Sequence, residues 1–194
     1  MRKVINLKLV FGLGNVGKEY FNTRHNIGFM VLDNYLSYKF SDVIWKDKFN
    51  SFCYKCVIEE EDVIFIKPKS FMNLSGEVVA KFVNYYHVDI SDILIICDDM
   101  NLNIGNFKLK MNGSSGGHNG LKNIELNLGT SNYKRLKIGI SKNNIDVINY
   151  VLGKFSNYEL DILGDVFDII NKLLDDYFIM SFDCLMNKYN VKNK

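Results

Sequence analysis

The sequence has no apolar run that reaches the ~18 residues needed to cross a membrane as a helix, so we expect no membrane span. Its N-terminus enters a strand-like pattern at once, without the layout of a secretory signal. Its four cysteines are therefore expected to be reduced thiols of a cytoplasmic protein. It also lacks internal repeats, linkers and low-complexity stretches. A chain of 194 residues with these features is expected to form one domain, residues 1–188, followed by a frayed tail, residues 189–194.

Net charge is also small, at +2, and this argues against avid nonspecific binding to nucleic acids. The charges are nevertheless unevenly distributed. Residues 102–154 carry eight basic side chains against two acidic ones, whereas residues 155–183 carry seven acidic side chains against one lysine. Such asymmetry is expected of a face that binds a polyanion and lies opposite an acidic face. Two ordinary solvated surfaces would give the same pattern, so charge alone leaves both interpretations open.

Alternating apolar segments predict an α/β fold. Strand-like runs are expected at residues 5–13, 49–58, 63–67, 93–97, 107–111 and 135–140. Helical patterns are expected at residues 23–40, 76–87, 118–128 and 145–152, and in a long C-terminal run that includes residues 162–173. The acidic residues 59–62 predict an antiparallel hairpin. Because the remaining strands alternate with helices, we predict a single domain with a twisted, mixed β-sheet and helices on both faces.

Residues 12–26 form the most informative segment, Gly-Leu-Gly-Asn-Val-Gly-Lys-Glu-Tyr-Phe-Asn-Thr-Arg-His-Asn. An apolar strand precedes the segment and a helical pattern begins inside it, so we expect His25 in the first helical turn, near the end of that strand. In an open α/β sheet this edge is the usual crevice for a ligand. A histidine placed there among amides, without a serine or cysteine nucleophile nearby, indicates a hydrolase that activates water.

The glycines of the same segment also admit a different function. The pattern Gly12-x-Gly14-x-x-Gly17 matches a dinucleotide fingerprint, and a nicotinamide-dependent oxidoreductase is therefore an alternative. In that fingerprint the helix starts within the glycine run and its N-terminus holds the pyrophosphate. Here a polar loop, residues 18–22, intervenes, and the fingerprint leaves Asn15 and His25 unexplained.

Two further motifs favour structural roles. The run Gly113-Ser114-Ser115-Gly116-Gly117 matches a nucleophile elbow, but the only histidine after it is His118, which is too close in sequence to turn back onto Ser115. Cys53 and Cys56 resemble half of a metal site, but residues three apart on a strand point to opposite faces. We therefore predict neither a serine triad nor a bound metal, and no cofactor.

Three more polar segments end strands or open helices, and we expect them to share one crevice with residues 12–26. Each has a simpler explanation when taken alone, as a helix cap, a strand end or a turn. They are Ser70-Phe71-Met72-Asn73-Leu74-Ser75-Gly76, Asp98-Asp99-Met100 and Ser115-Gly116-Gly117-His118-Asn119-Gly120. In order and spacing, from about Leu9 to Phe155, the four segments together resemble the signatures of the bacterial-type peptidyl-tRNA hydrolase family.

The resemblance implies a monomeric α/β enzyme that hydrolyses the ester between a peptide and its tRNA, and so releases free tRNA for translation. It implies that His25 is the catalytic histidine and that Asp98 is the acid that orients it. The substrate cleft would be lined by Asn15, Tyr20, Met72, Asn73, His118 and Asn119. Lys108, Lys110 and Arg135 would contact the tRNA, and residues 145–152 would correspond to a mobile helix that covers the cleft.

Two residues depart from the family pattern. Val16 replaces the usual proline, which loosens the loop without removing a chemical group. Cys97 stands where a histidine often precedes the aspartate, so any supporting role of that histidine is missing.

These residue types suit ester hydrolysis without a metal or a covalent nucleophile. An unperturbed histidine is a base near neutral pH, and a helix N-terminus disfavours its protonated form. Asp98 would fix the tautomer of His25, and Asn119 would donate to the developing oxyanion. Asn15 and Asn73 can bind peptide backbone, because an amide both donates and accepts hydrogen bonds. The basic segment would bind the phosphates of the tRNA acceptor stem, with the tRNA 3′ end in the cleft.

A noncatalytic tRNA-binding or ribosome-binding module with the same cleft is a further alternative. The presence of His25, Asp98 and Asn119 argues against it, because binding alone does not need a base and an oxyanion donor.

Overall fold

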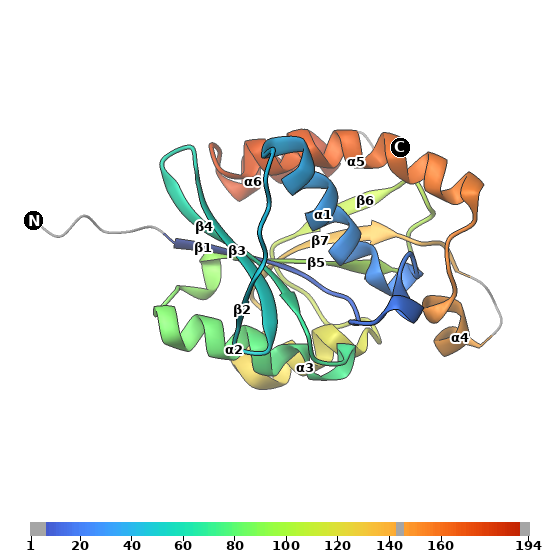
Figure 1. Cartoon of the computed structure of the whole chain (residues 1–194), viewed down its shortest axis with the longest axis horizontal. Coiled ribbons are helices and arrows are strands. Elements are labelled where there is room, and N and C mark those ends of the chain that lie inside the picture. The colour runs from blue at the N-terminus through green and yellow to red at the C-terminus, as the bar shows by residue number, and fades with distance from the viewer. Residues whose placement is uncertain (1–6, 143–145, 191–194) are drawn as a thin grey trace, which may run out of the picture.

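A computed structural model of the chain describes residues 7–142 and 146–190 (Figure 1). The strands are β1 (Leu7–Gly12), β2 (Lys46–Lys48), β3 (Ser51–Ile58), β4 (Glu61–Pro68), β5 (Ile93–Asp99), β6 (Phe107–Lys110) and β7 (Lys134–Gly139). The α-helices are α1 (Ile27–Lys39), α2 (Ser75–Tyr86), α3 (Asn119–Leu128), α4 (Val147–Leu152), α5 (Asn157–Tyr177) and α6 (Phe182–Tyr189). Short 3₁₀ turns are η1 (Lys18–Tyr20), η2 (Arg24–Asn26), η3 (Met72–Leu74) and η4 (Ile90–Asp92).

The strands form one sheet in the order β2-β3-β4-β1-β5-β7-β6. The four central strands, β4, β1, β5 and β7, run parallel, whereas β2, β3 and β6 are antiparallel to their neighbours. Helices α1, α5 and α6 cover one face and α2 and α3 cover the other (Figure 1). Strands buried on both faces must be apolar throughout, which explains the unbroken run Ile93–Cys97. The predicted mixed sheet with helices on both faces is confirmed.

The hairpin formed by β3 and β4 is confirmed, with a shorter loop than the acidic run suggested. Ile58 pairs with Glu61, so only Glu59 and Glu60 form the turn. Both turn residues have left-handed backbone angles, with φ of 48° and 63°, as a tight two-residue hairpin requires.

The first helix begins later than its apolar pattern predicts. Thr23 is extended and forms an isolated antiparallel bridge with Lys154, so the helix cannot start there. Residues Arg24–Asn26 form the 3₁₀ turn η2, and α1 starts at Ile27. His25 therefore lies in the turn that leads into α1.

Two elements were not predicted from the sequence. Strand β2 has three residues, two of them lysines, and carries too little apolar pattern to be recognised. Helix α6 is short, and the Ser181 hydroxyl caps its start by accepting from the Cys184 N–H.

The prediction that residues 189–194 form a frayed tail is wrong for Tyr189 and Asn190. Tyr189 is buried and donates a hydrogen bond from its hydroxyl to Asp176, 2.6 Å away. The side chain of Asn190 accepts from the Leu109 N–H and donates to the Leu109 carbonyl, at 2.9 and 3.0 Å. The rest of that tail, residues 191–194, lies outside the described residues. No helix within the described ranges is long and apolar enough to cross a membrane.

Two glycines allow α1 to cross the sheet closely at the base of the crevice. A Cβ on Gly28 would collide with the backbone of Leu13 and Ile96, and one on Gly12 would collide with the Gly28 carbonyl. This close crossing brings η2, and with it His25, against the ends of β1 and β5.

We expect Gly28→Ala to lower the free energy of unfolding by about 1–3 kcal/mol, because its methyl group meets backbone that cannot move aside. Gly164 of α5 is a matched control, since a Cβ there has no atom within 4 Å. Gly164→Ala should instead raise the free energy of unfolding by about 0.5–1 kcal/mol. Urea unfolding measures both. A Gly28→Ala protein as stable as the wild type would contradict the tight crossing.

Candidate active site

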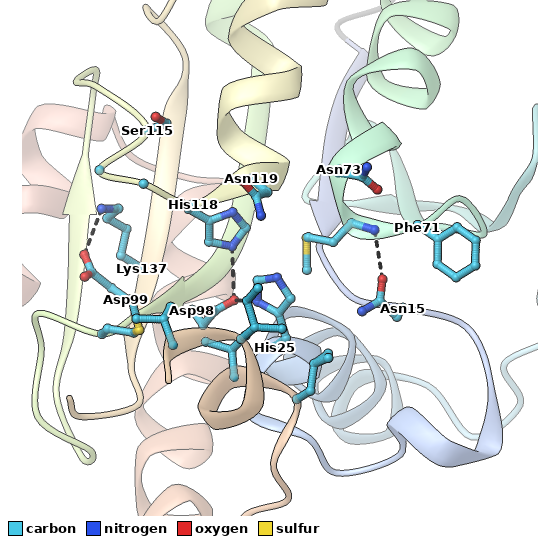
Figure 2. Close-up of a pocket in the computed structure, with 18 of the residues that line it drawn as sticks. Asn15, His25, Phe71, Asn73, Asp98, Asp99, Ser115, His118, Asn119 and Lys137 are labelled. Atoms are coloured by element: carbon cyan, nitrogen blue, oxygen red, sulfur yellow. Dashed lines mark hydrogen bonds and ion pairs between the residues drawn. The ribbon is translucent and has the colours of Figure 1, made fainter. Parts of the chain in front are cut away.

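A cleft of about 350 Å³ opens where β1 and β5 end, and its walls come from six separated segments of the chain (Figure 2). Figure 2 shows side chains from the ends of strands and the starts of helices converging on it. All the residues predicted to be catalytic or to bind substrate line this cleft: Asn15, Tyr20, His25, Met72, Asn73, Asp98, His118 and Asn119. The structure thus brings together residues that are up to 104 positions apart in the sequence, from Asn15 to Asn119.

The centre of the cleft is a carboxylate shared by two histidines. Nδ1 of His25 lies 2.8 Å from Oδ1 of Asp98, and Nε2 of His118 lies 3.1 Å from the same oxygen. The two imidazole rings are 5.0 Å apart. Asp98 is 3% exposed and His25 is 9% exposed, so water barely competes for these hydrogen bonds.

The surroundings of His118 determine which ring nitrogens carry protons. His118 is the N-cap of α3, and its Nδ1 accepts a hydrogen bond from the Leu121 N–H. Its proton is therefore on Nε2 and is donated to Asp98. An ionised Asp98 accepts from His25 as well, so we assign the His25 proton to Nδ1. Nε2 of His25 then keeps a lone pair, as a general base requires.

Asp98 stays ionised despite its burial. Burial alone would raise the pKa of Asp98, but electrostatic interactions and hydrogen bonds with His118 and His25 outweigh it. The pKa is held well below its usual range. An ionised carboxylate in this position accepts the Nδ1 proton and so fixes the tautomer of a neutral His25 ring.

His25, Asp98 and His118 form the one group of three possible metal ligands among residues 7–142 and 146–190, with donor atoms within 4.8 Å of one another. Their hydrogen bonds argue for protons rather than a metal ion at these positions. A metal ion on Nε2 of His118 would displace the proton that the α3 cap forces onto that atom. The donor set therefore fits a hydrogen-bonded triad.

Asn15 is held by a second asparagine. The Asn26 side chain accepts from the Asn15 N–H and donates to the Asn15 carbonyl, both at 2.9 Å. The amide oxygen of Asn15 in turn accepts from the Met72 N–H at 2.8 Å (Figure 2). Because that oxygen is occupied, the amide Nδ2 is the group that Asn15 can offer to a bound molecule.

Asn73 and Asn119 stand at the starts of two neighbouring helices, above His25 in Figure 2. Asn73 belongs to the 3₁₀ turn before α2, and Asn119 is the first residue of α3. The two helices approach closely, because a Cβ on Gly76 of α2 would collide with the backbone of Asn123 in α3. The amides are therefore presented from rigid helix ends, among N–H groups that point toward the cleft.

Burial contradicts the prediction that Arg135 contacts tRNA. Its side chain is fully buried and bonds to the carbonyls of Ser114 and Ser131 and to Glu125. It lies over the ring of Tyr133, 4.3 Å from its centre. Arg135 therefore secures the glycine-rich loop before α3 and has no surface to offer a phosphate.

Lys137 is the cation that the sequence prediction missed. It lies two residues further along β7, lines the cleft and pairs with Asp99 at 2.8 Å. Burial opposes ionisation of Asp99, but the hydrogen bonds from Lys137 and Asn101 and the charge of Lys137 together outweigh it and lower the pKa of Asp99. The position of Lys137 nearer the end of the strand was a signal that could have distinguished it from Arg135.

The predicted cations Lys108 and Lys110 do not line the cleft but lie beside it. They are exposed on the edge strand β6, and Lys108 pairs in register with Lys137. Residues directly opposite on neighbouring strands project from the same face. Lys108 therefore extends the positive surface away from the cleft wall.

Helix α4 forms an apolar wall that completes the cleft. The sequence predicted residues 145–152 only as a helix that covers the cleft, without naming side chains that line it. Four side chains of α4 line it: Val147, Ile148, Val151 and Leu152. The predicted helix started at residue 145, which lies outside the described residues. Phe71, another lining residue not predicted, is 64% exposed at the rim.

The serine triad considered from the sequence is not supported, and Cys97, the cysteine next to Asp98 in the sequence, is not placed as a nucleophile either. Burial raises the pKa of the Cys97 thiol, which packs in the core beneath α2 and α3 and does not line the cleft. Ser115 lines the cleft, but both ring nitrogens of its neighbour His118 are already engaged. The Cys53 and Cys56 side chains pack against opposite faces of the sheet, as predicted.

The dinucleotide alternative also fails on geometry. After Gly17 the chain forms η1, and the helix α1 begins ten residues later, at Ile27. A single 3₁₀ turn, and not the N-terminus of an α-helix, therefore follows the glycines, so the usual site for a pyrophosphate is not formed there.

Comparison with known proteins identifies the family. The family model for peptidyl-tRNA hydrolase matches residues 9–194. The chain belongs to the peptidyl-tRNA hydrolase family. It is 44% identical to the peptidyl-tRNA hydrolase of Mycoplasma capricolum subsp. capricolum, over 95% of this chain and 100% of that protein. It is 45% identical to that of Lactobacillus helveticus, with the same coverage of both chains.

A solved member of the family has the same fold. The crystal structure of peptidyl-tRNA hydrolase from Acinetobacter baumannii is similar with a TM-score of 0.89 and 32% identity, and the match covers 98% of this chain and 97% of that one. The family predicted from the four sequence motifs is confirmed, and with it the hydrolase class.

The ionised state of Asp98 leads to a prediction about acid stability. Its pKa is lower in the folded than in the unfolded protein, so its stabilising effect is complete above about pH 4 and is lost as the pH falls further. We expect the free energy of unfolding to fall more steeply below about pH 4 in the wild type than in Asp98→Asn, by at most ~1.4 kcal/mol per pH unit. Urea unfolding across this range measures both slopes. Equal slopes would show that Asp98 is not held ionised in the fold.

Proposed function

We propose that this protein hydrolyses the ester bond between the peptide and the tRNA of peptidyl-tRNA, and that His25 is the base that activates water. Membership of the family supports this substrate. The contact between His25 and Asp98 supports the role of His25. A buried, ionised carboxylate holds the proton on Nδ1 and leaves Nε2 free on the cleft side.

In the proposed reaction, Nε2 of His25 removes a proton from a water molecule as the water oxygen attacks the ester carbonyl carbon. The carbonyl oxygen becomes an oxyanion, to which Asn119 donates a hydrogen bond. When the bond to the ribose oxygen breaks, His25 returns its proton to that oxygen, so the products are a free peptide acid and tRNA with a free hydroxyl. Asp98 stabilises the protonated imidazole between these two steps.

His118 is proposed to position Asp98 rather than to contact the substrate through its ring nitrogens. Nδ1 caps α3 and Nε2 donates to Asp98, so both are engaged. His118 thereby joins the start of α3, which carries Asn119, to the end of β5, which carries Asp98.

The amides of Asn15 and Asn73 are proposed to bind the peptide backbone. Both line the cleft with His25, and Asn15 has its amide N–H₂ free to donate. Backbone groups are common to all peptides, so this mode of binding accepts many peptide sequences. Met72 would form the floor between them, and Tyr20 would lie beside the 3′ end of the tRNA.

The acceptor stem is proposed to lie along the positive surface formed by Lys137, Lys108 and Lys110. These lysines project from one face of neighbouring strands, at the rim of the cleft and beyond it. Phosphates bound there would direct the 3′ end toward His25. Because one chain supplies every group in this proposal, we propose that the protein acts as a monomer. The cytoplasmic location stays a prediction.

We expect His25→Ala to lower kcat for N-acetyl-aminoacyl-tRNA by ~10²–10⁴, with little change in tRNA affinity, because it removes the base but no phosphate contact. Single-turnover release of N-acetyl amino acid and a tRNA-binding titration measure the two effects. His87→Asn is a matched control, since His87 is exposed and has a left-handed backbone that asparagine tolerates. An unchanged kcat in His25→Ala would remove His25 from the mechanism, and binding without turnover by the wild type would favour a noncatalytic module.

We expect the double variant Lys108→Ala with Lys110→Ala to raise KM for peptidyl-tRNA roughly 10-fold and to make it less dependent on salt, because two phosphate contacts are lost. Lys46→Ala with Lys55→Ala is the control, because it removes the same charge from exposed residues at the opposite edge of the sheet. Steady-state kinetics at several salt concentrations compare the two. An equal loss on a small N-blocked ester, or equal effects of the two double variants, would contradict a local tRNA contact.

A further inference from the structure

Arg24, the residue before His25, contacts both α4, which forms the apolar wall of the cleft, and the start of α5. Its Nη2 lies 3.0 Å from both carboxylate oxygens of Glu159, near the start of α5. Its Nη1 donates to the Lys154 carbonyl at 3.0 Å. The guanidinium carbon lies 4.4 Å from the centre of the Tyr150 ring, on α4, and 5.4 Å from that of Phe155. The side chain of Arg24 is 14% exposed and that of Glu159 is 19% exposed.

The backbone strengthens the same junction. The Arg24 N–H donates to the Gly153 carbonyl at 3.0 Å, and the Phe155 N–H donates to the Asn22 carbonyl at 3.0 Å. Two residues that shortly precede His25 are therefore tied to the segment that directly follows α4. Tyr150 is also fixed on its other side, because its hydroxyl donates to the Ile140 carbonyl at 2.6 Å.

This junction matters because α4 is a wall of the cleft. Val151 and Leu152 follow Tyr150 on the same helix and line the cleft. A six-residue helix has little stability of its own, so its position depends on such tertiary contacts. Arg24 belongs to the turn that carries His25 and contacts this wall directly through the Tyr150 ring.

We propose that Arg24 is a positioning residue that fixes the distance between the α4 wall and His25. The inference rests on the proposed function of His25. A planar guanidinium can lie flat on Tyr150 while its edge bonds to Glu159 and Lys154. A lysine at this position keeps the charge but cannot make the flat contact and the two edge contacts at once. Arg24→Lys is therefore expected to loosen α4 while it retains the net charge.

Arg24→Lys is expected to lower kcat about 10-fold on both N-acetyl-aminoacyl-tRNA and a small N-blocked aminoacyl ester, with tRNA affinity unchanged. Hydrogen exchange of amides in residues 147–152 should accelerate about 10-fold, whereas exchange in β5 should not change. Lys39→Gln is the matched control, because it breaks an ion pair between α1 and α5 that lies away from α4. It should leave kcat and the exchange of α4 unchanged.

Tyr150→Leu removes the same contact from the α4 side, so the inference can still be tested if an Arg24 variant folds poorly. If both residues act through one contact, the double variant should be no slower than the slower single variant. Accelerated exchange in α4 with an unchanged kcat would overturn the inference, and so would unchanged exchange in both single variants. These outcomes are distinct from failure of the proposed function, in which the wild type would not release N-acetyl amino acid or His25→Ala would remain fully active.

Discussion

One carboxylate oxygen organises this site. Oδ1 of Asp98 accepts hydrogen bonds from His25 and His118, and these three residues come from β5, the turn before α1 and the start of α3. An unpaired buried charge would be strongly unfavourable, so the fold is most stable when both imidazoles are in place. The same contact that stabilises the charge also sets the tautomer of His25. The stability of the fold and the orientation of the His25 ring therefore depend on one arrangement. The asparagines and the α4 wall surround a ring that this arrangement has already oriented.

The fold and the inner part of the site could be predicted because their signals are local. The apolar run before Asp98, the glycines before Asn15 and the polar ends of strands each follow from short stretches of sequence. The start of α1 could not be predicted in this way, because a distant bridge between Thr23 and Lys154 decides it. The roles of His118 and Asn26 were hidden for a similar reason, since each depends on partners brought close only by the folded sheet.

The two cations of β7 illustrate the limit of pattern alone. Arg135 and Lys137 are two residues apart on one strand and so face the same side of the sheet. Their alternation along the strand does not distinguish them, and the position of Lys137 nearer the strand end is the one difference in the pattern. Arg135 is covered by the loop before α3 and by Tyr133, whereas Lys137 emerges at the cleft. The difference comes from what packs above each side chain, which is a property of the tertiary structure.

The two hydrogen bonds between the Asn190 side chain and the Leu109 backbone affect how the protein behaves in concentrated solution. β6 is the outer strand of its side of the sheet, and the outward-facing N–H and C=O groups of an outer strand are the kind that can recruit a strand from a second molecule. The Asn190 amide occupies both groups of Leu109 as a neighbouring strand would, and the flanking lysines add repulsion between copies. The side chain of Asn190 therefore opposes intermolecular β-pairing, and with it aggregation, at this edge of the sheet.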